Sequence, residues 1–206
     1  MTVIVGIECK GAVVIGADSA CSDTMTELPL KGTKLARIKA YHPIDNQIAG
    51  GCGSIRGLQV LQHSFETPAR KQDQSLEGWL ATEYMVVLRD AYKKAGVLTV
   101  KDEVAEGHNF LLGIGGRLFE VMDDFGFMRS HHGYLATGFG WQVALGALDV
   151  LYKPMMSPQL GRRTVLQALA ASCKHNHFCN WPLRLIWLDS EGKITMSEDF
   201  TDSSQF

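Results

Sequence analysis

The stretch that decides the fold is Met1-Thr2-Val3-Ile4-Val5-Gly6-Ile7, followed after a short break by Ala12-Val13-Val14-Ile15-Gly16-Ala17-Asp18. Both runs are rich in β-branched residues, and segment 8–11 between them is suited to a tight turn, so a β-hairpin is predicted. Because both runs are almost continuously apolar, we expect strands that are covered on both faces.

The composition is that of a globular protein. The chain has 206 residues, of which 46% are hydrophobic and 20% charged, with a formal net charge of −2. We expect one domain over residues 1–206, with no nucleic-acid partner, because the charges are scattered and show no basic excess. No signal peptide is recognisable, and no apolar run approaches the ~20 residues that span a membrane. The cysteines form no CxxC pair, which favours a reduced, cytoplasmic protein; they are Cys9, Cys21, Cys52, Cys173 and Cys179.

The order of the remaining elements predicts the architecture. Strands are expected over 34–40, 47–49, 110–114, 117–122 and near 127, helices over 54–66, 76–95, 141–152 and 161–174, and a closing hairpin over 183–188 and 193–196. Pro154 and Pro158 are expected to end the third helix, segments 19–33 and 101–108 to be polar connections, and the tail 197–206 to be loosely held. Strands and helix pairs alternate without βαβ units. An α+β fold, a four-layer αββα sandwich with two antiparallel sheets between helix pairs, satisfies this order best.

Thr2 directly follows the initiator Met1. Removal of Met1 would leave a hydroxyl and a free α-amine on one residue, which then contains both a nucleophile and a base. An α-amine titrates near pH ~7.7–8.0, so a useful fraction is neutral at cellular pH. A threonine at this position is ordinary by itself, and the catalytic interpretation therefore depends on the residues around it.

Several motifs lie along the chain in a fixed order. They are Thr2, Asp18 and Lys34 at intervals of sixteen residues, the run 11–19, the glycine turn Ile48-Ala49-Gly50-Gly51, and a glycine-led third helix from Thr137-Gly138-Phe139-Gly140 through 146–149. Together they resemble the proteasome β-subunit family, which includes the HslV-type bacterial peptidase. The similarity extends over nearly the whole chain, and it implies an N-terminal-nucleophile (Ntn) hydrolase with a four-layer αββα sandwich.

The resemblance implies a role for each matched residue. Thr2 would be the nucleophile through its Oγ, and its amine would take part in proton transfer. The Lys34 ammonium would favour the deprotonated nucleophile, and Asp18 would hold that ammonium in place and keep it charged. The Gly50 N–H would donate to the developing oxyanion, where one fixed donor is typically worth ~2.7–4 kcal/mol. Cys52 would line a roomy, mostly apolar specificity pocket.

Three positions depart from the family pattern. The family often has a serine just before the third helix that supports the nucleophile's amine; the candidates for this position are Thr137 and Phe139, and the alignment of the helix points to Phe139. Asn176 and Cys179 stand where an aspartate and a serine help to orient the N-terminus. An asparagine keeps the hydrogen bonding but lacks the charge, and a thiol is a weaker donor than a hydroxyl. The catalytic trio is intact, and its supporting network is altered.

Each of these residues also has an ordinary structural interpretation. Asp18 at a strand end is typical of a turn or capping residue, Lys34 can be a solvated side chain, and Cys52 can be a packed core thiol. His175, His177 and Cys179 lack the second ligand pair typical of zinc, so we expect no metal held by side chains. No cofactor is required, and the resemblance adds only a structural cation bound by backbone carbonyls.

The leading hypothesis is a threonine-type peptidase. It would be an N-terminal threonine endopeptidase in a self-compartmentalising, homo-oligomeric ring or double ring, cleaving unfolded polypeptide substrates that an ATP-dependent unfoldase delivers. Two alternatives stay open: a catalytically silent structural ring subunit, and an Ntn-type small-molecule amidase.

Overall fold

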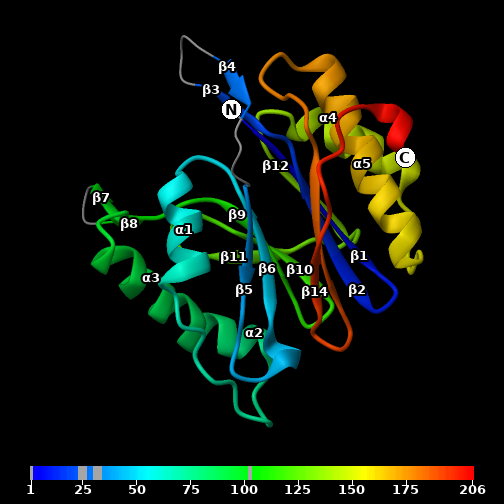
Figure 1. The fold of residues 1–206 in the computed structure, drawn as a ribbon. Helices are drawn as coiled ribbons and strands as arrows, with labels where there is room; N and C mark the ends of the chain where they lie inside the picture. The colour runs from blue at the N-terminus through cyan, green and yellow to red at the C-terminus, as the bar shows by residue number, and fades with distance from the viewer. Residues whose placement is uncertain (1, 23–26, 30–33, 102–103) are drawn as a thin grey trace.

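Two five-stranded antiparallel sheets stack face to face at the centre of the molecule, and helices cover both outer faces (Figure 1). The computed structural model describes residues 2–22, 27–29, 34–101 and 104–206. This architecture is the α+β, four-layer αββα sandwich that the sequence predicts, and the prediction is confirmed.

The first sheet is built around the N-terminal hairpin. Strand β1 (Val3–Cys9) pairs with β2 (Ala12–Ala17) in a register that places Ile4 opposite Ala17. The order of the whole sheet is β12 (Tyr134–Gly138), β1, β2, β13 (Arg184–Asp189) and β14 (Ile194–Met196). Two of its three inner strands, β1 and β2, come from the stretch that opens the chain.

The second sheet has the order β11 (Phe127–Arg129), β10 (Arg117–Val121), β9 (Phe110–Ile114), β6 (Gln47–Gly51) and β5 (Leu35–Ile38). Its outer face is covered by α1 (Ile55–His63), α2 (Leu76–Trp79), the π-helical turn η2 (Leu80–Tyr84) and α3 (Met85–Lys94). The expected helix over 76–95 is therefore three consecutive helical segments. The outer face of the first sheet is covered by α4 (Trp141–Leu151) and α5 (Pro158–His175).

The unbroken apolar character of the hairpin follows from this layering. Side chains alternate between the two faces of a strand. Ile4 packs between the sheets, whereas Val3, Val5 and Ile7 pack toward α4 and α5. A third cluster of buried side chains, which includes Trp79 and Tyr84, lies between the second sheet and its helices. Both faces of β1 and β2 are thus buried, as predicted.

Several sequence-based expectations are wrong in detail. Strand β12 was not predicted, although it pairs with β1 along its whole length. Pro158 does not end the third helix: it begins α5, where its missing N–H costs no helical hydrogen bond. The tail is held, because Phe200 bridges to Leu183 and Phe206 stacks on Trp181.

Short elements also occupy the expected connections. Strands β3 (Ala20–Ser22) and β4 (Glu27–Pro29) pair within the stretch expected as a long loop. Strand β7 (Thr99–Lys101), at the start of the second connection, pairs with β8 (Val104–Glu106) inside it. Single turns of 3₁₀ helix lie at η1 (Pro43–Asp45) and η3 (Ser203–Gln205).

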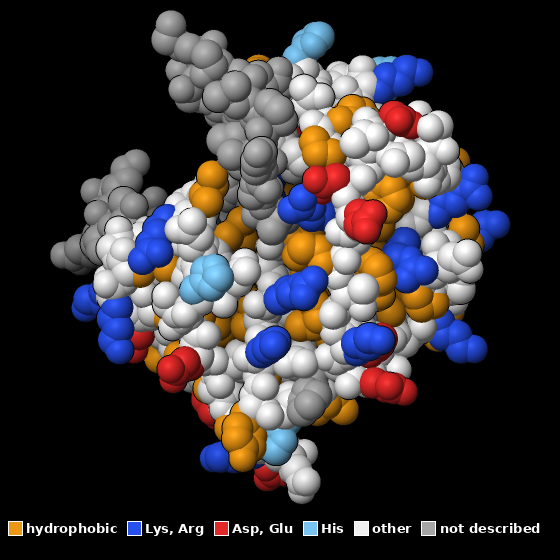
Figure 2. Space-filling model, viewed as in Figure 1, with side chains coloured by type: hydrophobic (Ala, Val, Ile, Leu, Met, Phe, Trp, Pro, Cys, Tyr) orange, Lys and Arg blue, Asp and Glu red, His pale blue; other side chains and the backbone are white. Residues whose placement is uncertain are grey.

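The described helices and the surface agree with the composition. Of the helices in the described ranges, none combines the length and the apolar character needed to cross a bilayer. Figure 2 shows basic and acidic side chains interspersed over the face seen in Figure 1. The cysteines whose side chains are described are free thiols: Cys9, Cys52, Cys173 and Cys179.

Candidate active site

Asp18 accepts several hydrogen bonds at the end of the sandwich where β1 begins. It follows β2 directly, and its carboxylate is completely buried. One oxygen, Oδ1, accepts the N–H of Val3 at 2.9 Å, and the other, Oδ2, accepts the N–H groups of Ala20 at 3.1 Å and Asn180 at 3.2 Å. The Asp18 N–H in turn donates to the Val3 carbonyl at 3.3 Å. Asp18 therefore fixes the backbone immediately after Thr2.

Lys34 completes this arrangement. It directly precedes β5, and its Nζ lies 2.7 Å from Asp18 Oδ1. The side chain of Lys34 is only 7% exposed. Removing two charges from water is costly, so a buried ion pair persists where additional hydrogen bonds satisfy its lone pairs. The three backbone donors on Asp18 provide them. Sixteen positions apart in the sequence, the two residues meet as the predicted pair.

Thr2 lies at the start of β1 and is 7% exposed. Its carbonyl accepts the Gly140 N–H at 3.4 Å. Gly138 lies against the same carbonyl with a φ of +88°, and a Cβ on it would be 2.4 Å from the Thr2 oxygen. Only glycine fits there without strain. The predicted removal of Met1 concerns a residue outside the described ranges.

The backbone of β6 orients its glycines in alternating directions. The Gly51 N–H donates to the Lys34 carbonyl at 3.0 Å, and the Cys52 N–H donates toward Asn109, beside β9, at 3.4 Å. Successive N–H groups of a strand point to opposite edges. The Gly50 N–H, which is paired with Leu111, therefore points toward β9. This geometry does not support the predicted donation from Gly50 to an oxyanion beside Thr2.

Cys52 lies on the inner side of the site, between the sheets. Its Sγ is 3.8 Å from Thr137 Oγ1 and 3.8 Å from the Asn109 carbonyl oxygen. Burial raises the pKa of the Cys52 thiol, and the hydrogen bond with Thr137 opposes that rise. A raised pKa keeps the thiol neutral, so Cys52 suits a pocket lining and not a nucleophile.

Asn176 connects two aromatic residues on the outer side of the site. Its Nδ2 donates to the Phe139 carbonyl at 2.9 Å, and its Oδ1 accepts the Phe178 N–H at 2.9 Å. The Cys179 thiol is buried, and a Cβ on Gly140 would lie 2.8 Å from its Sγ. All three departures from the family pattern thus gather around the backbone that contacts Thr2.

Two supporting residues were missed in the sequence. Ser172 is fully buried on α5, and its Oγ lies 3.1 Å from both the Gly140 and the Ala168 carbonyl oxygens, which share its one hydroxyl proton. A serine on the apolar face of a predicted helix was the available signal. Asn180 donates to Asp18 and accepts the Ser19 N–H at 3.0 Å. This second contact depends on loop geometry and had no sequence signal.

No candidate metal centre is found in the described ranges, where no three His, Cys, Asp or Glu side chains lie close enough together to hold an ion. The cation bound by backbone carbonyls stays a prediction.

The chain is similar along most of its length to curated archaeal proteins. It is 24% identical over 199 residues to a proteasome subunit beta of Methanocaldococcus sp. strain FS406-22, covering 96% of this chain and 85% of that protein. It is 25% identical over 191 residues to proteasome subunit beta 2 of Pyrobaculum calidifontis, covering 91% and 89%. No family model matches the chain.

Solved structures share the fold at lower identity. The Anbu (Gly-1) mutant from Hyphomicrobium sp. strain MC1 superposes with a TM-score of 0.71 at 16% identity, covering 98% of this chain and 88% of that one. BPH of Thiobacillus denitrificans, solved in complex with epoxomicin, gives a TM-score of 0.71 at 16% identity, covering 91% and 98%. The chain is thus similar in sequence to proteasome β subunits, and it shares the fold of the Anbu and BPH structures.

Proposed function

We propose that this protein is an N-terminal threonine endopeptidase that uses Thr2 as its nucleophile after removal of Met1. The observation that carries the proposal is the buried pair of Asp18 and Lys34, whose shared carboxylate oxygen also holds the N–H of Val3. The Lys34 ammonium and the N–H of Val3, the first residue of β1, thereby bond to the same oxygen, Asp18 Oδ1. Such an arrangement is suited to activating a residue at the start of that strand.

In the proposed reaction, Thr2 Oγ attacks the carbonyl carbon of a peptide bond and its proton passes to the free α-amine. The Lys34 ammonium stabilises the negative charge on Oγ as it forms, and burial strengthens this effect. The leaving amine takes the proton, and an ester on Thr2 Oγ remains. Water then hydrolyses the ester, with the α-amine again as the base, and restores the hydroxyl.

The proposed substrates are unfolded polypeptides, and the proposed assembly is a homo-oligomeric ring or double ring in the cytoplasm with an ATP-dependent unfoldase as partner. The similarity to proteasome β subunits supports the ring. The free thiols of the described cysteines are compatible with a reducing compartment.

A specific observation favours a second candidate, a catalytically silent ring subunit. The Gly50 N–H points toward β9, and Phe139 stands where a serine would support the amine. An active site needs a fixed donor at the oxyanion. A silent subunit would keep the Asp18–Lys34 pair for stability alone.

Intact-mass measurement and kinetics on the same preparation separate the two candidates. For the peptidase we expect a mass that lacks Met1, turnover of fluorogenic peptides, and a covalent adduct with a β-lactone or boronate probe. Thr2→Ala should lower turnover by roughly 10³-fold or more. Thr82→Ala, at an exposed site on the opposite helical layer, is the matched control and should retain activity. Retained Met1 with no adduct, or equal turnover by wild type and Thr2→Ala, would falsify the peptidase proposal.

A further inference from the structure

Two aromatic side chains lie exposed beside the candidate active site. Phe139 is 57% exposed and Phe178 is 40% exposed. Their rings contact each other edge to face, with centroids 5.4 Å apart and an interplanar angle of 64°. Single exposed apolar side chains are common on protein surfaces, but a paired aromatic surface beside a reaction centre indicates a binding function.

The pair is fixed in place by one side chain. Asn176 donates to the Phe139 carbonyl and accepts the Phe178 N–H, so a single amide group positions both residues. An ionised aspartate could accept the second bond but could not donate the first. The asparagine that departs from the family pattern is thus the residue type that this arrangement requires.

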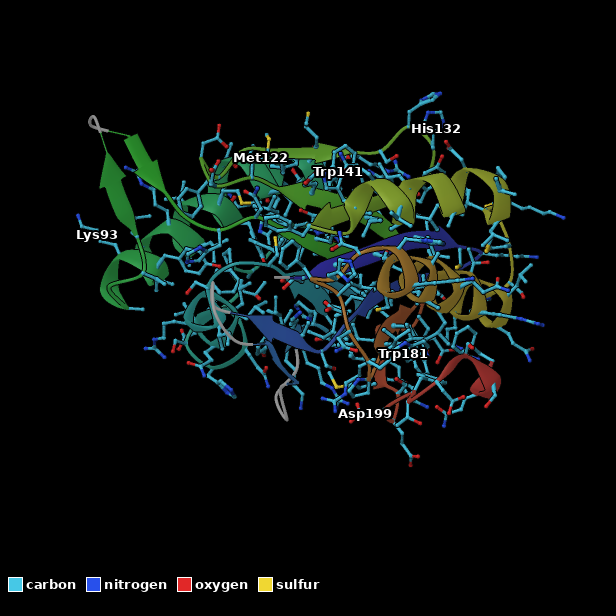
Figure 3. All side chains as sticks on the ribbon, turned by 90° about the horizontal axis from the view of Figure 1, so that it is seen from above. Lys93, Met122, His132, Trp141, Trp181 and Asp199 are labelled. Atoms are coloured by element: carbon cyan, nitrogen blue, oxygen red, sulfur yellow. The ribbon has the colours of Figure 1, made fainter. Side chains whose placement is uncertain are left out.

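The pair lies next to Thr2 through the backbone. Phe139 is the residue between Gly138 and Gly140, and both glycines contact the Thr2 carbonyl oxygen. Figure 3 looks onto this end of the sandwich and labels Trp141, the first residue of α4, two positions beyond Phe139. A polypeptide that reaches Thr2 therefore passes within side-chain reach of the aromatic pair.

The two sides of Thr2 differ. Cys52, the residue directly after β6 of the second sheet, contacts Thr137 on the inner side of β12, between the sheets. Asn176 and Phe178 follow α5, which covers the outer face of the first sheet. If the substrate residues before the cleaved bond lie on the Cys52 side of Thr2, the residues after that bond, which leave with the amine, lie on the outer side. This is the side of Phe139 and Phe178.

We propose that Phe139 and Phe178 form a subsite for a large apolar side chain on the leaving-group side of the cleaved bond, with Asn176 as its positioning residue. This inference rests on the proposed peptidase function. An aromatic surface removes apolar area of the substrate from water, so the subsite selects leucine or phenylalanine over serine or aspartate at that position. A hydrophobic pocket of this kind typically discriminates by roughly tenfold to a hundredfold.

The test uses two internally quenched peptides that are identical except for leucine or serine immediately after the cleaved bond, with the cleavage position verified by mass spectrometry. For the Met1-free protein we expect kcat/KM to favour leucine by roughly tenfold. Phe139→Ala and Phe178→Ala should each reduce the ratio to roughly twofold or less. Asn176→Asp should lower the ratio although both rings remain. Asn176→Gln retains an amide group, so its ratio should lie between those of Asn176→Asp and the wild type.

Val150→Ala is the matched control, because Val150 is an exposed apolar residue of α4 at 80% exposure. It should leave the ratio unchanged. Two results would overturn the subsite but not the peptidase proposal. One is Thr2-dependent turnover without a preference for leucine in the wild type. The other is a leucine preference that persists in both phenylalanine variants. The subsite is equally overturned if the phenylalanine variants slow both peptides alike and change the oligomer size in light scattering, since the pair is then a contact between copies of the chain. Absence of any Thr2-dependent turnover overturns both proposals.

Discussion

Replacement of Asp18 by asparagine tests the central contact of the structure. The carboxylate accepts Lys34 Nζ and the N–H groups of Val3, Ala20 and Asn180. Each carboxylate oxygen accepts two of these four donors, and an asparagine keeps only one accepting oxygen, so two of the donors would face its NH₂ group. We expect Asp18→Asn to be strongly destabilising, because a buried ammonium loses the charge that compensates it.

The expected magnitude follows from the type of loss. Removing one partner of a buried ion pair typically costs about 3–5 kcal/mol, which is a large part of the roughly 5–15 kcal/mol of a typical domain. Lys34→Met should cost less, about 1.5–3 kcal/mol, since it removes one charged hydrogen bond. The Asp18 carboxylate keeps its backbone donors from Val3, Ala20 and Asn180 in that variant.

Urea unfolding followed by circular dichroism gives the free energy of unfolding of each variant. Equal m-values for the variants and the wild type check that unfolding exposes the same surface in each. Asp123→Asn, at an exposed aspartate, is the control and should change the free energy by no more than about 0.5 kcal/mol. The double variant should be scarcely less stable than Asp18→Asn alone. A loss below about 1 kcal/mol for Asp18→Asn, or a larger loss for Lys34→Met, would refute the reasoning.

Three further predictions concern other contacts. Gly138→Ala should destabilise the protein by about 1–3 kcal/mol, because φ is +88° and the new Cβ would lie 2.4 Å from the Thr2 carbonyl oxygen; urea unfolding measures it, and an unchanged midpoint contradicts it. Tyr84→Phe should cost about 1–3 kcal/mol, since the fully buried Gln47 Oε1 loses the donor that bonds it at 2.8 Å; a neutral effect would mean that Gln47 finds another donor. Burial lowers the pKa of His108, so the folded state binds fewer protons than the unfolded state and the free energy of unfolding decreases as the pH falls below about 6.5 toward the lowered pKa. His108→Gln should flatten that slope in thermal melts between about pH 5 and 7, and an unaltered slope rules His108 out as its source.

The layers of the fold could be predicted because local apolar patterns dictate them. The continuous apolar hairpin indicated strands buried on both faces, and Ile4 and Val3 do pack on opposite sides of the first sheet. Strand β12 was overlooked because Tyr134, Leu135 and Ala136 are only partly buried and give no clear pattern. The sequence leaves the role of Pro158 ambiguous, since a proline can follow the end of one helix or begin the next.

For the candidate site, too, some features could be predicted from the sequence and others could not. The resemblance to the proteasome β-subunit family implied that Asp18 pairs with Lys34, and the structure brings the two side chains together. The roles given to Thr2 and Cys52 stay proposals. The direction of the Gly50 N–H could not be predicted from its glycine motif, because the pairing of β6 with β5 and β9 decides it.

The sequence by itself therefore determined the sandwich and the residue types at the candidate site, because burial patterns and chain spacing are local properties. Only the tertiary structure decided that Asn176 connects Phe139 with Phe178, and that Asp18 receives the N–H of Asn180 from a loop 162 positions away. Hydrogen bonds depend on the direction of both partners, and distant segments acquire that direction only when the layers pack.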